Sequence, residues 1–213
     1  MSKLLNFTPL LDTLLVDKNG RFAENKLKGG DKDVIIKVSK KDVKNNTLRK
    51  NKDGSLKGSY RVSDGYEAGS IHTVSNSKGT AVVTTNEQAE SVYDFLSDNT
   101  VVEFSHIEYK FNGGETQSSI TTSHSWRADS YGTDMVNEII DSELKTLVSY
   151  THNHSSTFSG PYPSTKEHSI GNGGGDVTLF QKWTKEQGNV IKFYIKHNGV
   201  TREFDQYGNE IKP

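Results

Sequence analysis

The sequence predicts an α+β protein, with a mixed β-sheet flanked by helices and a small β-rich region at the N-terminus. Runs of alternating or β-branched residues recur along most of the chain, which is typical of strands. Two segments, over residues 86–97 and after residue 176, instead carry apolar residues at helical spacing. Apolar residues make up only 31% of the chain, but nine Tyr, nine Phe and two Trp supply material for a core. We therefore expect a globular fold with large loops.

The N-terminal region has the pattern of short strands joined by turns. The stretch LLDTLLVDKNGRF predicts a strand, a turn at residues 18–20 and a returning strand, and DVIIKV at residues 33–38 predicts another strand. From Lys37 to Arg61, nine Lys or Arg residues stand against two Asp, and NKDGS within this run predicts an Asp-Gly turn. We expect a solvated basic hairpin there.

Strands and helices alternate in the rest of the chain. Thr85 is a suitable N-cap for the helix over residues 86–97, and Asp176 takes an N-cap or first-turn position in the last helix. The other expected elements are strands over 100–111, 118–126 and 145–154, a helix over 133–144 and a hairpin over 189–208.

The composition excludes several classes of function. The chain has no cysteine, so a bound transition metal must be held by His, Asp or Glu, and zinc nucleobase deaminases and cysteine proteases are excluded. The net charge of −1 predicts no particular partner, and we expect neither nucleic-acid nor membrane binding. Asp12 interrupts the apolar N-terminal patches, so we expect neither a signal peptide nor a membrane span and assign no location.

The stretch VSYTHNH, at residues 148–154, places two histidines at the end of a predicted strand. Side chains two apart in a strand point to the same side, so His152 and His154 can direct both imidazoles to one point while Asn153 points away. Two histidines and a carboxylate, with an open fourth position, are typical of catalytic zinc. The pair therefore predicts a metal site only if a third ligand is present.

Further motifs accompany this pair: Glu103 in SDNTVVEF, then HNH, then a loop containing YPS, and then GGGDVTLF. Together they resemble the JAMM (JAB/MPN-domain) metalloproteases, in particular the JAB-like toxin domains at the C-termini of bacterial RHS-type polymorphic toxins. The resemblance covers roughly residues 86–205. It implies a JAMM/cytidine-deaminase-like core in a domain over residues 81–213, with residues 1–80 as a β-rich lead or carrier junction.

The resemblance also implies a role for each matching residue. The zinc ligands correspond to His152, His154 and Asp176, the general base to Glu103, and the hydroxyl that stabilises the oxyanion to Ser164. A metal, a carboxylate base and a fixed hydroxyl donor together suit hydrolysis. The implied activity is that of a peptidase or isopeptidase that cleaves an amide bond with Zn²⁺ as cofactor.

Three departures from the family pattern bear on the third ligand and its loop. Asn153 stands where Ser or Thr is common, and Ser155 where Pro is common. The eukaryotic and archaeal pattern places the acidic ligand three positions after the Ser, where this sequence has Glu167. We favour Asp176, because it opens a helix and follows a Gly-rich insertion like that of the toxin branch. Glu167, with the adjacent His168, is the alternative third ligand.

Other functions stay open at this level. Glu108 competes with Glu103 as the base, and a JAMM-like domain with an incomplete ligand set would bind a protein without hydrolysing it. The basic run over 37–61 leaves a metal-dependent nuclease as a further alternative. The tripeptide HNH does not indicate an HNH nuclease, whose residues are dispersed in a ββα unit that is not evident here. The toxin interpretation further implies a protein or peptide substrate, a cognate immunity protein and delivery within a larger secreted toxin.

Overall fold

The structure is a computed structural model that describes residues 11–27, 34–47, 49–54, 57–62, 71–154, 160, 162–164 and 175–212. Within these ranges the chain forms two β-sheets with helices packed against them, so the predicted α+β class is confirmed. None of the helices in the described ranges is long and apolar enough to cross a bilayer.

The order of the elements is close to the predicted one. The strands are β1 (Leu11–Val16), β2 (Phe22–Leu27), β3 (Val34–Lys37), β4 (Ser59–Val62), β5 (His72–Ser75), β6 (Thr80–Val83), β7 (Ser105–Phe111), β8 (Thr116–Thr122), β9 (Lys145–Asn153), β10 (Lys192–His197) and β11 (Val200–Phe204). The helices are α1 (Lys40–Asn45), α2 (Asn86–Asn99), α3 (Ser130–Ile140) and α4 (Gly175–Gln187).

The first sheet, with strand order β2-β1-β3-β4, contains the predicted N-terminal hairpin. The expectation of a basic hairpin over residues 37–61 is wrong in its first half, because α1 forms there. Its N-cap is Ser39, whose hydroxyl accepts the Asp42 N–H at 3.2 Å and donates to the Asp42 carboxylate at 2.7 Å. This local pairing favours a helix start over an extended arm.

The second sheet has the order β11-β10-β9-β7-β8-β6-β5. β9 and β10 run parallel, and the other described neighbours run antiparallel, so the sheet is mixed as predicted. Parallel neighbours need a crossover, and α4 lies in the connection between β9 and β10. The loop that precedes α4 therefore starts where β9 ends.

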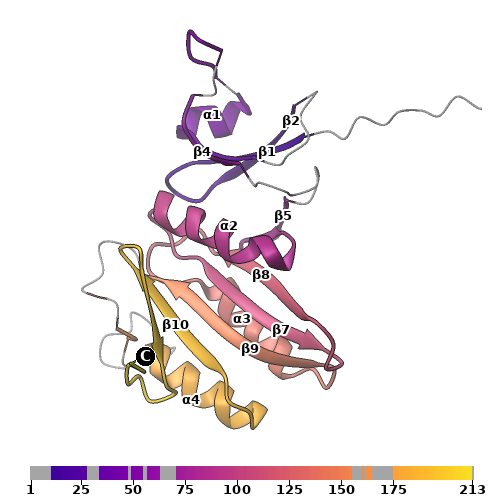
Figure 1. Cartoon of the computed structure of the whole chain (residues 1–213), viewed down its shortest axis with the longest axis vertical. Helices are drawn as coiled ribbons and strands as arrows, with labels where there is room; N and C mark the ends of the chain where they lie inside the picture. The colour runs from indigo at the N-terminus through magenta and orange to yellow at the C-terminus, as the bar shows by residue number, and fades with distance from the viewer. Residues whose placement is uncertain are drawn as a thin grey trace, which may run out of the picture.

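Helices cover both faces of the second sheet (Figure 1). α3 and α4 pack on one face, where Phe180 stacks on Phe193 with ring centroids 4.1 Å apart and Trp183 is fully buried. Trp183 is therefore a core residue. α2 packs on the opposite face and lies between the two sheets.

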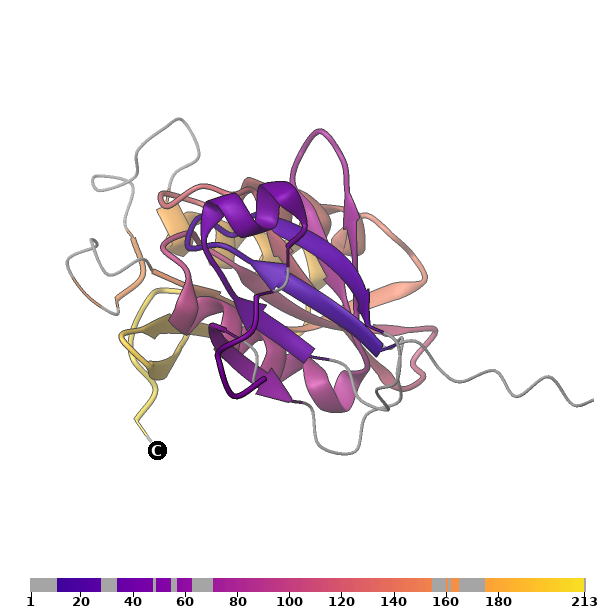
Figure 2. The same ribbon diagram turned by 90° about the horizontal axis from the view of Figure 1, so that it is seen from above.

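One apolar core joins the two sheets through α2. Leu14, Val16 and Ile35 of the first sheet share a buried cluster with α2, with Ile120 of the second sheet and with Phe104, which directly precedes β7. Viewed from above, the first sheet lies over α2 and the second sheet (Figure 2). β5, which begins before residue 80, already belongs to the second sheet, and a domain boundary near residue 80 stays a prediction.

The turn between β1 and β2 lies directly on the segment that leads into β7. The N–H of Val101 donates to the carbonyl of Lys18 at 2.8 Å, and the rings of Phe22 and Phe104 meet edge to face at 6.2 Å. Gly20 has φ +69°, and a Cβ there would lie only 2.5 Å from Val102 Cγ2. The approach of this turn to the second sheet therefore requires glycine.

We predict that Gly20→Ala destabilises the protein far more than Gly54→Ala. Both glycines have positive φ, which costs an alanine about 1–2 kcal/mol, but a Cβ at Gly54 meets no atom within 4 Å. At Gly20 the clash with Val102 adds about 1–3 kcal/mol of overpacking. Urea denaturation of the two variants and the parent measures the difference, and equal losses would contradict the packing argument.

Candidate metal centre

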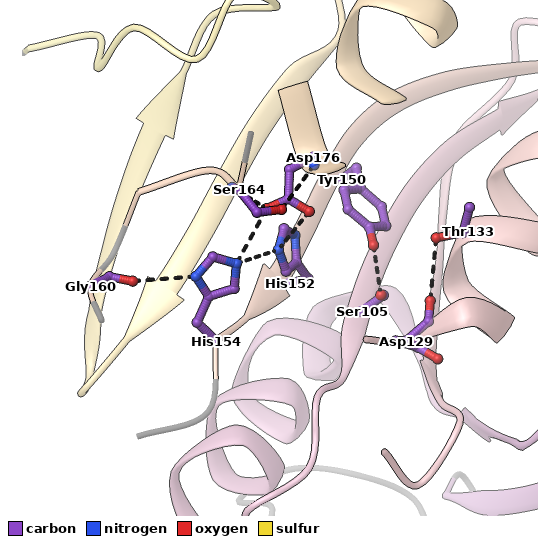
Figure 3. A network of polar contacts seen from close by, with 9 residues as sticks. All are labelled: Ser105, Asp129, Thr133, Tyr150, His152, His154, Gly160, Ser164 and Asp176. Carbon is purple, nitrogen blue, oxygen red and sulfur yellow. Dashed lines mark hydrogen bonds and ion pairs between the residues drawn. The ribbon is translucent and has the colours of Figure 1, made fainter. Parts of the chain in front are cut away.

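The two histidines lie at the C-terminal end of β9, on the face of the second sheet that α3 and α4 cover. His152 pairs across the sheet with Ser105 of β7 and Ile195 of β10, and His154 follows just after the strand ends. Both are buried, with 4% and 5% of their surfaces exposed. Figure 3 shows the rings of His152 and His154 pointing toward the same place, next to Asp176, as the alternation of strand side chains predicted.

α4 brings Asp176 to the same point from its first turn. The N–H and the hydroxyl of Ser164 donate to Asp176 Oδ2 at 2.7 and 2.9 Å, and the N–H of Asp176 donates back to the Ser164 hydroxyl at 3.1 Å. Ser164 thus both caps the helix and fixes the carboxylate. In the part of the chain that the structure describes, His152, His154 and Asp176 are the only group of His, Asp and Glu side chains whose ligand atoms all lie within 4.8 Å of one another.

The spacing of the three side chains fits a tetrahedral metal ion. The two Nε2 atoms of His152 and His154 lie 3.0 Å apart, and they lie 3.5 and 3.3 Å from the carboxylate oxygens of Asp176. Two ligand atoms, each about 2.1 Å from a tetrahedral zinc, are about 3.4 Å apart. The donor set and its geometry therefore suit zinc, and three protein ligands leave a fourth position open.

The other ring nitrogens of the two histidines have different surroundings. His154 Nδ1 lies 3.3 Å from the carbonyl of Gly160, which can only accept, so Nδ1 carries the proton and Nε2 is free to bind a metal. His152 Nδ1 is buried and has no hydrogen-bond partner among the described residues. One ligand ring is therefore oriented by a second partner, and the other by the packing of Tyr150, whose ring centroid is 5.4 Å away.

Charge attraction dominates the electrostatics of this group. Burial disfavours the charged form of Asp176, yet His152 and His154 hold the pKa of its carboxyl well below the usual value. Burial likewise opposes a charged His152, but the adjacent Asp176 raises the pKa of its imidazole overall. Protons therefore compete with a metal ion for His152, which makes metal affinity fall as the pH is lowered.

Glu103 lies beside this group but not in a strand. β7 begins at Ser105, so Glu103 sits in the irregular segment before it, with 4% of its surface exposed. Burial raises the pKa of Glu103 to about 8; the positive side chain of His152 opposes this, and the charge of Asp176 adds to it. The backbone N–H of Asp129 also hydrogen-bonds the carboxylate and favours its charged form. A carboxyl that titrates near neutral pH can accept and return a proton.

The remaining candidates are separated from the site or lie outside the described residues. Glu108 accepts a hydrogen bond from Ser149, three pairs along the β7–β9 ladder from His152, so it does not reach the histidines. Glu167 and His168, the alternative third ligand, fall outside the described residues. His124 contacts the hydroxyl of Thr80 at 2.9 Å rather than the metal-ligating group.

Sequence reasoning missed three residues that support the site. The side chain of Asn153 hydrogen-bonds the backbone on both sides of Glu103. Tyr150 packs on His152, and its hydroxyl lies 3.0 Å from that of Ser105 (Figure 3). Asp129 is buried and accepts hydrogen bonds from Thr121 and Ser123 at 2.6 and 2.8 Å. Of the three, only Asp129 could have been singled out from the sequence, because Asp is a common N-cap residue and it directly precedes α3.

We predict that Glu103→Gln removes a pH dependence of stability from the metal-free protein. Because the folded pKa, about 8, is above the unfolded value of 4.5, the folded state holds more protons between these pH values. The stabilisation from this group is complete below about pH 4.5 and is lost as the pH rises through 8, by on the order of 5 kcal/mol. Chemical denaturation after chelation, at pH 5 to 9, measures this slope.

Glu108→Gln is the matched control, because it changes the same type of side chain away from the metal-ligating group. It should keep the slope of the parent. A Glu103→Gln variant with the parent's slope would contradict the assignment of a raised pKa to this carboxyl.

Comparison with known proteins agrees with this geometry. Residues 81–181 match the family model described as JAB-like toxin 1. No curated protein and no solved structure matches the chain. The matched segment runs from β6 into α4 and includes Glu103, both histidines, Ser164 and Asp176. The match supports a JAB-like toxin domain over residues 81–181.

Proposed function

We propose that this domain is a zinc-dependent peptidase or isopeptidase and the toxin module of an RHS-type bacterial polymorphic toxin. The observation that carries the proposal is the convergence of His152, His154 and Asp176 at separations suited to tetrahedral zinc. With these three residues as ligands the set is complete, and this supports hydrolysis over a JAMM-like module that only binds a partner. Burial and the open fourth position favour a catalytic rather than a structural metal.

The chemistry of the site follows from its side chains. Zinc at the three ligands would supply a Lewis acid that polarises the amide carbonyl and lowers the pKa of water. Glu103, with a pKa near 8, would take the proton from the attacking water and pass it to the leaving amine. The N–H of Asp129 keeps the Glu103 carboxylate oriented during this transfer.

Ser164 has two proposed roles. Its N–H and hydroxyl hold Asp176 in place as a ligand. Its expected role as donor to the oxyanion requires the hydroxyl to turn from Asp176 to the substrate, while the N–H keeps the carboxylate fixed. This change of partner lets one residue serve both ligand and substrate.

The same proposal includes the partners that a toxin requires. The substrate is a protein or peptide, because the site is suited to amide hydrolysis, and a cognate immunity protein protects the producing cell. Delivery occurs as part of a larger protein. The proposal does not include nucleic-acid binding. Part of the basic run over residues 37–61 forms α1, which connects strands of the first sheet, and the described residues of this run do not contribute to the candidate site.

Elemental analysis of the purified protein tests the metal. We expect about one zinc per chain in the parent and in Glu167→Ala, and none in His152→Ala or Asp176→Ala, because a tetrahedral site loses most of its affinity with a ligand. Loss of zinc in Glu167→Ala with retention in Asp176→Ala would make Glu167 the third ligand. A parent without zinc after reconstitution would contradict the peptidase and leave a binding module.

The base has its own test. Glu103→Gln should keep its zinc but cleave peptides of a mixed library about 10²- to 10⁴-fold more slowly, as read by mass spectrometry, because only proton transfer is lost. Glu108→Gln should cleave at the rate of the parent. Equal rates in parent and Glu103→Gln would remove Glu103 from the mechanism.

Ser164→Ala should weaken zinc binding about tenfold or more, because Asp176 loses a hydrogen bond that orients it. Competition with a chelating dye measures this affinity. Ser97→Ala, which removes a hydroxyl bonded to a backbone carbonyl in α2, is the control and should bind as the parent does. Unchanged affinity in Ser164→Ala would show that the N–H alone fixes the carboxylate.

A further inference from the structure

Asn153, the residue between the two histidines, holds the backbone on both sides of Glu103. Its Nδ2 donates to the carbonyl of Val102 at 3.1 Å, and its Oδ1 accepts the N–H of Phe104 at 2.7 Å. These two groups belong to the two peptide units that flank Glu103. The side chain lies on the face of the sheet opposite His152 and is 4% exposed, so water does not compete for these bonds.

This contact replaces a strand ladder at the point where the ladder stops. β7 begins at Ser105, and its pairing with β9 ends at Ser105 and His152, so no ladder holds Glu103. One backbone bond continues, from the N–H of Asn153 to the carbonyl of Phe104 at 3.2 Å. The reciprocal N–H of Phe104 goes to the side chain of Asn153 instead. The amide therefore lets the segment leave the sheet without losing its hydrogen bonds.

The other two polar groups of these peptide units are also satisfied. The N–H of Glu103 donates to the carbonyl of Ser125, and its carbonyl accepts from the hydroxyl of Thr122, both at 2.8 Å. With both peptide planes fixed, the direction of the Glu103 side chain is set by its rotamer alone. Only an amide side chain offers a donor and an acceptor at the spacing that both flanking groups need.

We propose that Asn153 is a positioning residue that sets the Glu103 carboxylate relative to the metal ligands. Residues 152–154 then supply two ligands on one side of the sheet and the anchor of the base on the other. The catalytic meaning of this inference rests on the proposed function. The clamp itself, formed by Asn153 on Val102 and Phe104, is a property of the fold and can be tested without metal or substrate.

Amide hydrogen exchange in the metal-free protein tests the clamp. In Asn153→Ala, the Phe104 N–H should exchange about tenfold or more faster than in the parent, because it loses its acceptor, while the N–H of Ile107 in β7 changes far less. Asn99→Ala is the matched control, because it removes an Asn side chain bonded to the Phe95 carbonyl in α2. It should leave the Phe104 rate unchanged.

Asn153→Asp is a second variant that separates loss of the hydrogen bond to Phe104 from a general loss of structure in Asn153→Ala. It keeps an acceptor for the Phe104 N–H but cannot donate to Val102, so Phe104 should stay protected. Unchanged protection of Phe104 in Asn153→Ala would overturn the clamp. So would a uniform acceleration of all core amides in both variants, which would show a general packing role.

The positioning claim has a separate readout in the protein loaded with Co²⁺. With ¹³C-labelled glutamate, the paramagnetic shift of the Glu103 carboxyl should change in Asn153→Ala while the shifts of the ligating histidines do not. An unchanged Glu103 shift would overturn positioning even if the clamp is real. A parent that takes up no metal would instead overturn the proposed function, and the exchange result would still decide the clamp.

Discussion

The candidate site depends on the antiparallel pairing of β7 with β9. This pairing places Ser105 opposite His152, and a slip of one residue would turn His152 to the α2 face of the sheet. Buried residues fix the register, because Ile107 and its partner Tyr150 both pack against α3 and α4. An irregularity at Glu108 and Tyr109 also keeps Leu147 in this core, although it stands three residues from Tyr150. The core thus decides which way the ligand strand faces.

Two carboxyls in this site have pKa values that are shifted in opposite directions. Asp176 lies against both imidazoles and is held in its charged form, whereas Glu103 is buried further from them and favours its neutral form. Two carboxyls whose environments separate their pKa values in this way are suited to different tasks. Asp176 is suited to bind a cation, and Glu103 to exchange a proton near neutral pH.

The sequence was informative where one local rule decides the structure. The period of two in a strand predicted that His152 and His154 converge, and helical spacing predicted α2 and α4, with Asp176 in the first turn of α4. It was wrong where charge outweighed a local cap signal: the basic charge of residues 37–61 suggested an extended hairpin, but the Ser39 cap favours a helix at α1. It also gave no indication of contacts between residues that are distant in the sequence. The hydrogen-bond partners of Asn153 lie about fifty positions away along the chain, so no local pattern could show that its amide binds the backbone on both sides of Glu103.

The support of Glu103 reaches beyond the segment that defines the family. Asn153 holds this part of the chain from β9, whereas Lys18 and Gly20 hold it from the hairpin of the first sheet. The match begins only at residue 81, so this hairpin lies outside it, as do β10 and β11. An apolar core shared by Leu14, Val16 and α2 makes the hairpin part of the same packing unit. The packing unit that supports the candidate site therefore includes the first sheet as well as the matched segment.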